Sequence, residues 1–285
     1  KTPPYAIFQA EEGGTIITLY ESGKAMFQGI SADIDANMWK DIERNLTGNV
    51  IKVKDTKEKK KEEKETRKNF YSLSTIGSDE VGTGDFFGPI VVTGAYISKE
   101  QVSKMEELGV KDSKKLTDEK ILEIGPTLIK EVNHCTFILN NTSYNEYQKK
   151  GYNMNKIKAI LHNKVLVEMK KRQPSYDKIV VDQFVYPRKY FEHINEATEK
   201  VTDITFVTKA ESICASVAAA SCISRYVFLK KMNEISDEIH LPLLKGAGTL
   251  VDKQASEIVK NYGMDKLKEI AKLNFKNTEK LKEYL

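Results

Sequence analysis

The sequence contains few of the residues from which many binding sites are built. Of its 285 residues, three are cysteines, four are histidines and one is tryptophan. The cysteines, Cys135, Cys214 and Cys222, are odd in number and lack the spacing of metal ligands, so we expect buried, reduced thiols and no zinc site. No apolar run approaches the ~18 residues of a membrane-spanning helix, and no signal peptide is visible. We therefore expect a cytoplasmic protein without a membrane anchor.

The net positive charge comes from one segment. The chain has 45 Lys and Arg residues against 41 Asp and Glu residues, a net charge of +4. Residues 52–68 alone hold nine basic and five acidic residues, so the remaining 36 basic and 36 acidic residues balance. Overall basicity therefore does not argue for nucleic-acid binding. We interpret residues 51–69 as a charged linker, either an exposed helix or a mobile tether, whose lysines could also contact phosphates.

Residues 1–50 are interpreted as a small α+β unit. Three β-prone segments at 5–10, 15–20 and 25–29 are separated by turn sequences, and a helix is expected over 31–46. The apolar residues on one face of that helix are Ile34, Met38, Trp39 and Ile42. A unit this small is marginally stable alone. Because the chain begins with Lys1, we expect preceding residues to complete it.

Two adjacent carboxylates, Asp79 and Glu80, mark the end of a predicted strand. Gly82-Thr83-Gly84 follows as a turn, and a β-branched strand is expected over 90–97. Neighbouring strand residues point to opposite faces, so Asp79 and Glu80 would share a pocket only if a twist or bulge re-aimed one of them. Taken alone, the pair fits a solvated surface position better.

Two further carboxylates stand at the ends of predicted elements. Asp182 ends the apolar strand 178–182, and ligands of α/β sheets bind beyond strand ends. Glu211 precedes an Ala- and Ser-rich helix predicted over 213–232, whose small residues would let it pack closely on a sheet. Each acid also has a structural interpretation, Asp182 as a turn residue and Glu211 as compensation of the helix dipole.

Together, the four acids predict a divalent metal site. Carboxylates without His or Cys ligands favour Mg²⁺ or Mn²⁺. Clustered carboxylates repel one another unless cations lie between them. Two ions ~4 Å apart would stabilise the attacking and leaving oxygens of an in-line phosphoryl displacement, one helping to form hydroxide and the other neutralising a leaving 3′ oxygen.

Candidate phosphate contacts occur between these acids. Ser113, Lys114 and Lys115 offer suitable donors just before a helix predicted from Thr117 to about Val132. Taken alone, such paired lysines are usually solvated surface. A strand over 134–140, a short helix over 144–150, a long helix over 155–171 and a strand over 204–208 complete the predicted elements before the C-terminal region.

In their order along the chain, these motifs resemble those of bacterial ribonuclease HIII. The matching segments are Asp79 to Pro89, Asp112 to Leu116, Asn153 to Asn155, Val181 to Gln183, Lys209 to Ser212 and Ala218 to Ser221. The sister family, ribonuclease HII, usually has Gly-Arg-Gly in place of Gly82-Thr83-Gly84 and Asp in place of Glu211. Residues 19–29 resemble half of the saddle domain of TATA-binding proteins, which fits the extra N-terminal domain of ribonuclease HIII. The alternative for this unit is a hairpin-plus-helix packing module.

The resemblance implies a ribonuclease H fold, a five-stranded mixed sheet flanked by helices, over residues 70–285. It implies metal-dependent endonucleolytic cleavage of the RNA strand of RNA/DNA hybrids, leaving 5′-phosphate and 3′-hydroxyl ends. Two Mg²⁺ or Mn²⁺ ions would be held by Asp79, Glu80, Asp182 and Glu211. The implied substrate contacts are Gly82, Thr83 and Gly84 at RNA 2′-hydroxyls, and Ser113, Lys114, Lys115, Asn155 and Lys209 at phosphates or the groove. We expect a monomer without an obligate protein partner.

Other functions remain open at this point. A non-catalytic module could bind hybrids through the N-terminal unit and linker, although retention of all four acids argues against it. A ribonuclease HII-like enzyme would cut at single embedded ribonucleotides, and a Mg²⁺-dependent phosphatase is a more distant alternative. From Leu243 onward, two or three Lys-rich helices are expected, which either contact the duplex or form a packing tail.

Overall fold

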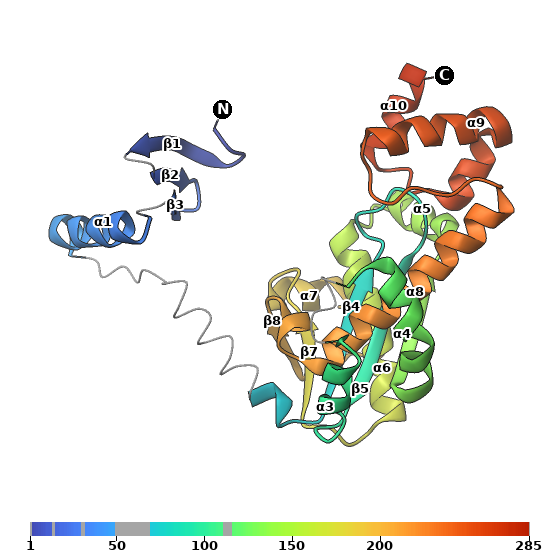
Figure 1. Cartoon of the computed structure of the whole chain (residues 1–285), viewed down its shortest axis with the longest axis horizontal. Coiled ribbons are helices and arrows are strands. Elements are labelled where there is room, and N and C mark those ends of the chain that lie inside the picture. The colour runs from blue at the N-terminus through green and yellow to red at the C-terminus, as the bar shows by residue number, and fades with distance from the viewer. Residues whose placement is uncertain (1, 13–14, 30–31, 49–68, 111–115, 285) are drawn as a thin grey trace. The chain divides into compact units, whose positions relative to one another are not determined.

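The computed structural model describes residues 2–12, 15–29, 32–48, 69–110 and 116–284. The chain divides into two compact units, residues 1–65 and 66–285 (Figure 1). The predicted linker over 51–69 lies almost wholly outside the described residues, as do Ser113, Lys114 and Lys115, so these interpretations stay predictions. No helix among the described residues is long and apolar enough to cross a membrane.

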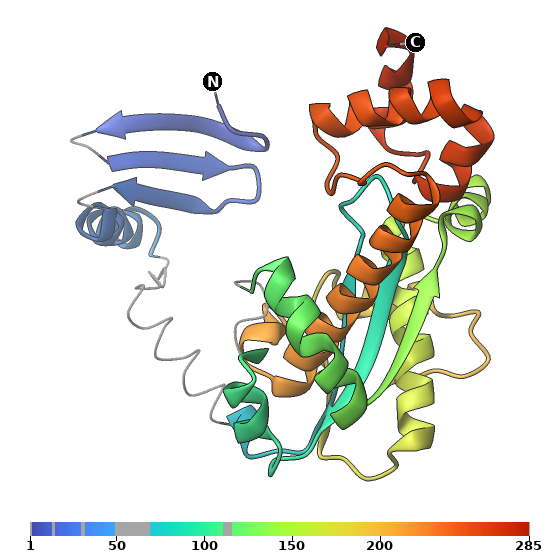
Figure 2. The same cartoon turned by 45° about the vertical axis from the view of Figure 1, so that its right-hand side comes forward.

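The N-terminal unit is an antiparallel sheet with one helix. Its strands, in the spatial order β1-β2-β3, are β1 (Ala6–Glu12), β2 (Thr15–Tyr20) and β3 (Ala25–Gly29), and α1 (Ala32–Thr47) packs along β3 (Figure 2). The three predicted strands and the helix are confirmed. The sheet covers the apolar face of α1 incompletely, since Met38, Trp39 and Ile42 stay 44–50% exposed. Trp39 makes an edge contact with Phe27 at 6.2 Å between ring centres.

The second unit is built on a five-stranded mixed sheet, which confirms the predicted fold class. Its strands are β4 (Thr75–Val81), β5 (Ile90–Ile97), β6 (Asn133–Leu139), β7 (Lys178–Asp182) and β8 (Ile204–Val207). The spatial order is β6-β5-β4-β7-β8, with β5 antiparallel to both β4 and β6, and β7 parallel to both β4 and β8. The predicted strand 134–140 is therefore an edge strand. Asp79 and Glu80 therefore lie on the central strand of the sheet, near the C-terminal end of that strand.

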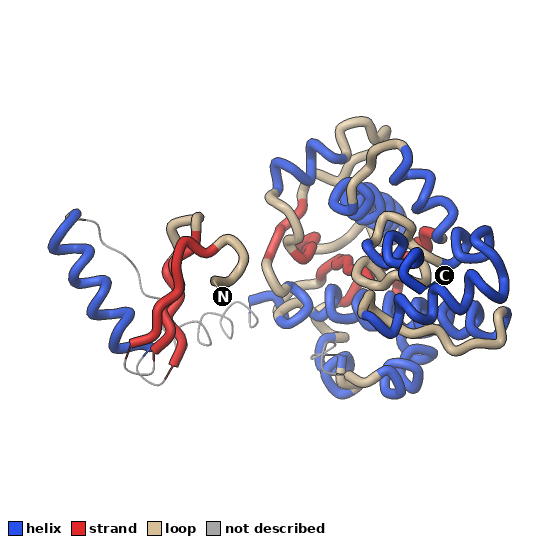
Figure 3. The backbone as a smooth tube through the Cα atoms, turned by 90° about the horizontal axis from the view of Figure 1, so that it is seen from above, coloured by secondary structure: helices blue, strands red, loops and turns tan. Residues whose placement is uncertain are grey.

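Helices cover both faces of this sheet (Figure 3). One face carries α3 (Val102–Glu107), α4 (Asp118–Glu131) and α8 (Ala215–Glu238). The other carries α6 (Met154–Arg172), which is flanked by α5 (Asn141–Lys149) and α7 (Pro187–His193). The side chain of Thr117 accepts a hydrogen bond from the Lys120 backbone N–H, as expected for the residue that begins α4. All three cysteines are buried and free, as predicted.

Small residues bring α8 against β4. Ala218 and Ala219 of α8 are 1% and 0% exposed, and Gly77 of β4 lies against Ser216 and Val217 of the same helix. A Cβ atom at Gly77 would lie 2.4 Å from the Val217 backbone nitrogen, so only glycine permits this approach. The prediction of close packing is confirmed. The predicted start of the helix at Ile213 was wrong, because a separate 3₁₀ turn, η2 (Ala210–Ser212), precedes Ala215.

The C-terminal helices pack on the loop that follows β4. They are α9 (Thr249–Ile270), which Gly263 interrupts at φ +80°, and α10 (Lys276–Tyr284). The fully buried Lys272 donates from Nζ to the backbone oxygens of Asp85, at 2.9 Å, and Gly88, at 2.5 Å. Phe86 and Phe87 are buried in the same cluster. Of the two interpretations of this region, the contacts support packing, and a duplex contact stays a prediction.

Candidate active site

Strand β4 presents Asp79 and Glu80 on opposite faces of the sheet. Asp79 pairs with Thr93 and Glu80 with Val92 of β5, and no register shift interrupts this ladder. The bulge that would have re-aimed one side chain is therefore absent, and ordinary strand alternation holds. Asp79 faces α8, and Glu80 faces α6.

On the α8 face, Asp79 meets hydroxyl groups and other carboxylates. Ser221 makes a side-chain hydrogen bond with its carboxylate, and the Ser224 hydroxyl donates to its backbone oxygen at 3.1 Å. Burial is the largest influence on the carboxyl group and the nearby charge of Glu80 is the next, so together they raise the pKa of Asp79 to about 8. Asp182 adds to the same effect. Negative charge on this face is therefore incompletely balanced.

On the α6 face, Glu80 is bound by two nitrogen donors. Lys158 Nζ lies 2.5 Å from Oε1, and His162 Nε2 lies 2.8 Å from Oε2. The other imidazole nitrogen, Nδ1, is 2.7 Å from the Ser78 hydroxyl. Burial opposes ionisation of Glu80, but the His162 and Lys158 contacts outweigh it and lower the pKa of Glu80 to about 2.

Asp182 and Glu211 complete the acidic set from neighbouring elements. In the parallel β4–β7 pair Ser78 is opposite Val181, so Asp79 and Asp182 follow at the same edge of the sheet. Asp182 Oδ1 accepts a hydrogen bond from the Ala210 backbone N–H at 3.0 Å, which ties β7 to η2. Glu211, the next residue, is only 6% exposed. Glu211 therefore belongs to the turn η2 and precedes α8, in agreement with its predicted position before that helix.

The donor chemistry of this site fits a hard divalent cation. The four side chains offer carboxylate oxygens. Burial and, after it, the neighbouring negative charge raise the pKa of Asp79, and a bound cation would neutralise that charge. Among the residues that the structure describes, no three His, Cys, Asp or Glu side chains are already grouped as metal ligands. Lys158 and His162 each contact one oxygen of Glu80.

The glycines of the turn after β4 have different surroundings. Gly82 is buried at φ +93°, and a Cβ atom there would lie 2.2 Å from the Pro89 backbone oxygen. Gly84 is exposed, and a Cβ atom there would meet no atom within 4 Å. Thr83 between them is half-buried. Gly82 is therefore required for the conformation of the turn, whereas the space beside Gly84 is open.

The remaining predicted substrate contacts are exposed where they are described. Asn155 lies in the first turn of α6. Lys209 precedes η2 at φ 57° and ψ 41°, a left-handed conformation that is uncommon for a residue other than glycine. Leu116 directly follows the Ser113-Lys114-Lys115 motif, which lies outside the described residues. Arg225 donates hydrogen bonds to the Leu116 backbone oxygen at 2.7 Å and to the Asp118 carboxylate at 2.6 Å.

The sequence-based interpretation missed Lys158 and His162. His162 had been counted as one of four scattered histidines without a zinc pattern, yet it is fully buried against Glu80. The signal that could have found the two residues is their spacing of four on a strongly predicted helix, which puts both side chains on one face. That spacing alone does not say which strand they face.

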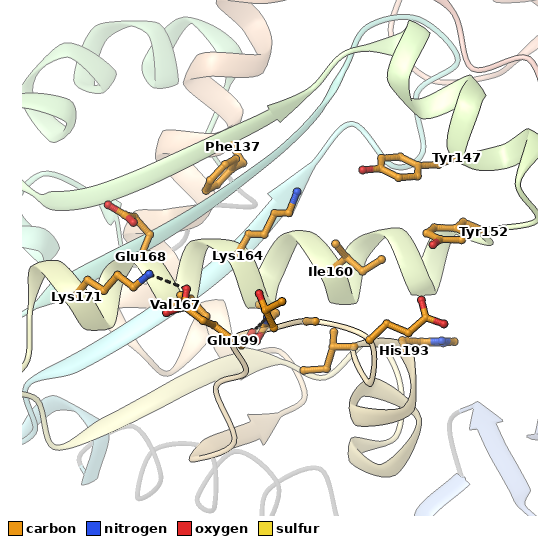
Figure 4. A pocket seen from close by; sticks show the side chains of 15 residues that line it. Phe137, Tyr147, Tyr152, Ile160, Lys164, Val167, Glu168, Lys171, His193 and Glu199 are labelled. Carbon is orange, nitrogen blue, oxygen red and sulfur yellow. Dashed lines mark hydrogen bonds and ion pairs between the residues drawn. The ribbon is translucent and has the colours of Figure 1, made fainter.

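A separate groove lies beside other residues of α6. It has a volume of about 570 Å³, and its labelled lining includes Phe137, Tyr147, Tyr152, Ile160 and Lys164 (Figure 4). None of the four acids lines it. The four acids are therefore not part of this groove. The candidate active site is identified by its carboxylates and not by a cavity.

Comparisons with known proteins agree with this geometry. Residues 76–278 match the family model described as Ribonuclease HII, and residues 1–52 match a model described as a domain of unknown function, DUF3378. The chain is similar to Ribonuclease HIII of Bacillus licheniformis, at 41% identity over 97% of this chain and 88% of that protein. It is 42% identical to Ribonuclease HIII of Bacillus velezensis, over 98% of this chain and 88% of that protein.

Solved structures show the same relationship. The crystal structure of Bst-RNase HIII in complex with Mn²⁺ matches with a TM-score of 0.75 and 38% identity, over 99% of this chain and 90% of that chain. Aquifex aeolicus RNase H3 matches with a TM-score of 0.57 and 24% identity, over 96% of this chain and 90% of that chain, which supports the fold alone.

Proposed function

This chain belongs to the ribonuclease HIII family, and we propose that it is an endoribonuclease that hydrolyses the RNA strand of RNA/DNA hybrids with Mg²⁺ or Mn²⁺ as cofactor. Its products would be 5′-phosphate and 3′-hydroxyl ends. The observation that carries the proposal is that Asp79, Glu80 and Asp182 lie at the same ends of the neighbouring strands β4 and β7, close enough for their charges to interact although Asp79 and Glu80 face opposite sides of the sheet. The Mn²⁺ complex of Bst-RNase HIII supports the choice of cation.

The acids of this site would hold the cations, and the residues around them would fix their positions. Two cations between Asp79, Glu80, Asp182 and Glu211 would supply an activated water and neutralise charge on the leaving oxygen. His162 orients Glu80, and the Ala210 backbone N–H orients Asp182. The partly buried surroundings strengthen each of these contacts relative to a fully exposed site.

The turn after β4 would recognise the RNA strand. Gly84 leaves room for the backbone of the substrate, and the turn amides could then hydrogen-bond to 2′-hydroxyls, which distinguish RNA from DNA. Thr83, Asn155 and Lys209 would add contacts to the groove or phosphates, as would Ser113, Lys114 and Lys115 from the undescribed segment.

The N-terminal unit would increase the affinity for the duplex. Its sheet exposes Ile7, Phe8, Ile16 and Met26 by 36–62%, and the lysines of residues 52–68 follow it. Removal of residues 1–68 should weaken hybrid binding and flatten its salt dependence, because each lost phosphate contact lowers the slope of log affinity against log salt by about 0.9. Unchanged binding at moderate salt would contradict this role. The proposed enzyme acts as a monomer.

Cleavage of a labelled RNA/DNA hybrid in Mg²⁺, Mn²⁺ or EDTA tests the proposed function. Wild-type protein should cut the RNA strand only with a cation, and Asp79→Asn should not cut it. A duplex with one embedded ribonucleotide is the comparison substrate, because the match to the Ribonuclease HII model favours activity at single ribonucleotides as the second candidate. Efficient cutting of that duplex would favour the second candidate. Tight hybrid binding without cutting of either substrate would support a binding module.

A further inference from the structure

Both oxygens of the Glu80 carboxylate are already engaged by α6. Lys158 and His162 contact them at 2.5 and 2.8 Å, and the side chains of Glu80 and Lys158 are only 13% and 12% exposed. Such shielded contacts are stronger than surface ion pairs, which solvent and salt weaken. Glu80 is therefore a carboxylate with a bound cationic partner, the Lys158 ammonium group.

An aromatic ring holds this arrangement together. Phe184, two residues after Asp182, lies with its ring centre 4.0 Å from Lys158 Nζ and 5.3 Å from the centre of the His162 ring. The ammonium group thus lies between the face of a ring and a carboxylate, and both attract it. Ser78 holds His162 from the other side, through Nδ1. The position of Lys158 is therefore set by the packing of α6 on β4 and on the segment after β7.

The Lys158 ammonium group lies against one oxygen of a carboxylate that would hold a divalent cation. Lys158 contacts Oε1 of Glu80 and His162 contacts Oε2, so a divalent cation bound at Oε1 would lie beside the Lys158 ammonium group. Two cations on the same oxygen repel each other strongly in partly desolvated surroundings.

We propose that Lys158 is an internal counter-ion that competes with the divalent cation for Glu80, so that its ammonium group must leave Oε1 before the cation binds there. The inference rests on the proposed function in taking Glu80 as a metal ligand. His162 would keep Glu80 in place during the exchange, through Oε2. Lys158 would then set the cation concentration at which the site fills, as a positioning residue that acts through Glu80.

Calorimetric titration with Mn²⁺, without any hybrid, tests the competition. Lys158→Met should bind Mn²⁺ at least about tenfold more tightly than wild type, because a cationic competitor beside the ligand is removed. Lys158→Arg retains the positive charge beside Glu80 and should stay within about threefold of wild type. Lys164→Met is the matched control, since it removes the same charge from an exposed position of α6 in the groove of Figure 4 and should leave the affinity unchanged.

Cleavage supplies a second readout. The Mn²⁺ concentration that gives half-maximal cleavage should fall in Lys158→Met in parallel with the dissociation constant. Lys158→Gln provides the same comparison with a polar side chain, should the Met variant not fold. Unchanged or weaker Mn²⁺ binding in the folded neutral variants would overturn the inference, and so would an equal gain in Lys164→Met. If wild type cleaves the hybrid but the neutral variants do not differ from it in Mn²⁺ affinity, only this inference fails. A wild type that neither binds Mn²⁺ nor cleaves the hybrid overturns the proposed function as well.

Discussion

The two faces of β4 surround their carboxylates with different chemistry. On the α8 face, the main influences on Asp79 are burial, two neighbouring carboxylates and hydrogen bonds, and its pKa rises to about 8. On the α6 face, Lys158 and His162 bind Glu80, and its pKa falls to about 2. Of these two adjacent residues, Asp79 therefore resists ionisation and Glu80 favours it. The chain itself supplies positive charge to Glu80, while Asp79 lies where a cation from solution would bring the larger electrostatic benefit.

The largest expected effect follows from removing the carboxylate on the α8 face. Asp79→Asn should lower kcat by about 10³-fold or more, because a Lewis-acid contact contributes several kcal/mol and each 1.36 kcal/mol is tenfold in rate. Asp182→Asn should have a comparable effect. Steady-state cleavage of the labelled hybrid with Mn²⁺ measures both, and circular dichroism checks that the variants are folded. A variant that keeps more than a tenth of the wild-type kcat would contradict the assignment of its carboxylate.

The contacts on the α6 face can be removed by replacing the buried His162. His162→Phe removes a hydrogen-bond partner from both Ser78 and Glu80, and a buried group left without its partner costs about 2–3 kcal/mol. Urea unfolding of the metal-free protein should show a loss of that size in the free energy of unfolding. His193→Phe, on the less buried α7, is the control and should cost much less. Equal stabilities of the two variants would mean that the His162 network contributes little.

The two faces should also respond to pH with opposite sign. The pKa of Asp79 is raised from its ordinary 3.8 to about 8, so the folded state holds an extra proton between these values and stability falls as pH rises through this range. The pKa of Glu80 is lowered from 4.5 to about 2, so its contribution is present above pH 4.5 and is lost as pH falls towards 2.

Thermal melts in EDTA can separate these contributions. Asp79→Asn should raise Tm relative to wild type by about 3 °C or more at pH 8.5 and by less at pH 5, where wild-type Asp79 is already protonated. Glu80→Gln should instead lower Tm at pH 6, with the difference shrinking as the pH approaches 2. If the two variants show the same pH trend, the faces do not differ in the way that the structure indicates.

Much of this site could be predicted from local patterns. The apolar strands that carry Asp79 and Asp182, and the small-residue helix α8 apart from its exact start, follow from periodicities that depend on neighbouring residues. Strand alternation also predicted correctly that Asp79 and Glu80 face opposite sides. A turn such as η2, with Lys209 at positive φ, is less predictable because non-glycine residues seldom adopt that conformation.

What the patterns could not supply is the partner of each face. His162 contacts Glu80 across 82 positions of the chain, and Lys272 reaches the Asp85 backbone oxygen across 187. Contacts of this kind depend on which helix covers which side of the sheet, and hydrophobic periodicity is the same for either side. His162, Lys158 and Lys272 therefore had no local sequence signal that separated them from ordinary helix or surface residues.

The turn that ends β4 offers the smallest and most selective test, because it adjoins both faces without belonging to either. Gly84→Ala should change the free energy of unfolding by no more than about 0.5 kcal/mol, since the added methyl group meets open space. If the substrate backbone approaches there, the same methyl group should raise KM for the hybrid severalfold while both carboxylates keep their surroundings. Gly82→Ala is the contrasting variant, and its strained φ and contact with the Pro89 oxygen should cost about 2–3 kcal/mol. If Gly84→Ala keeps both the wild-type KM and the wild-type stability, the substrate is recognised elsewhere. The turn would then have no influence on the carboxylates on the two faces of β4.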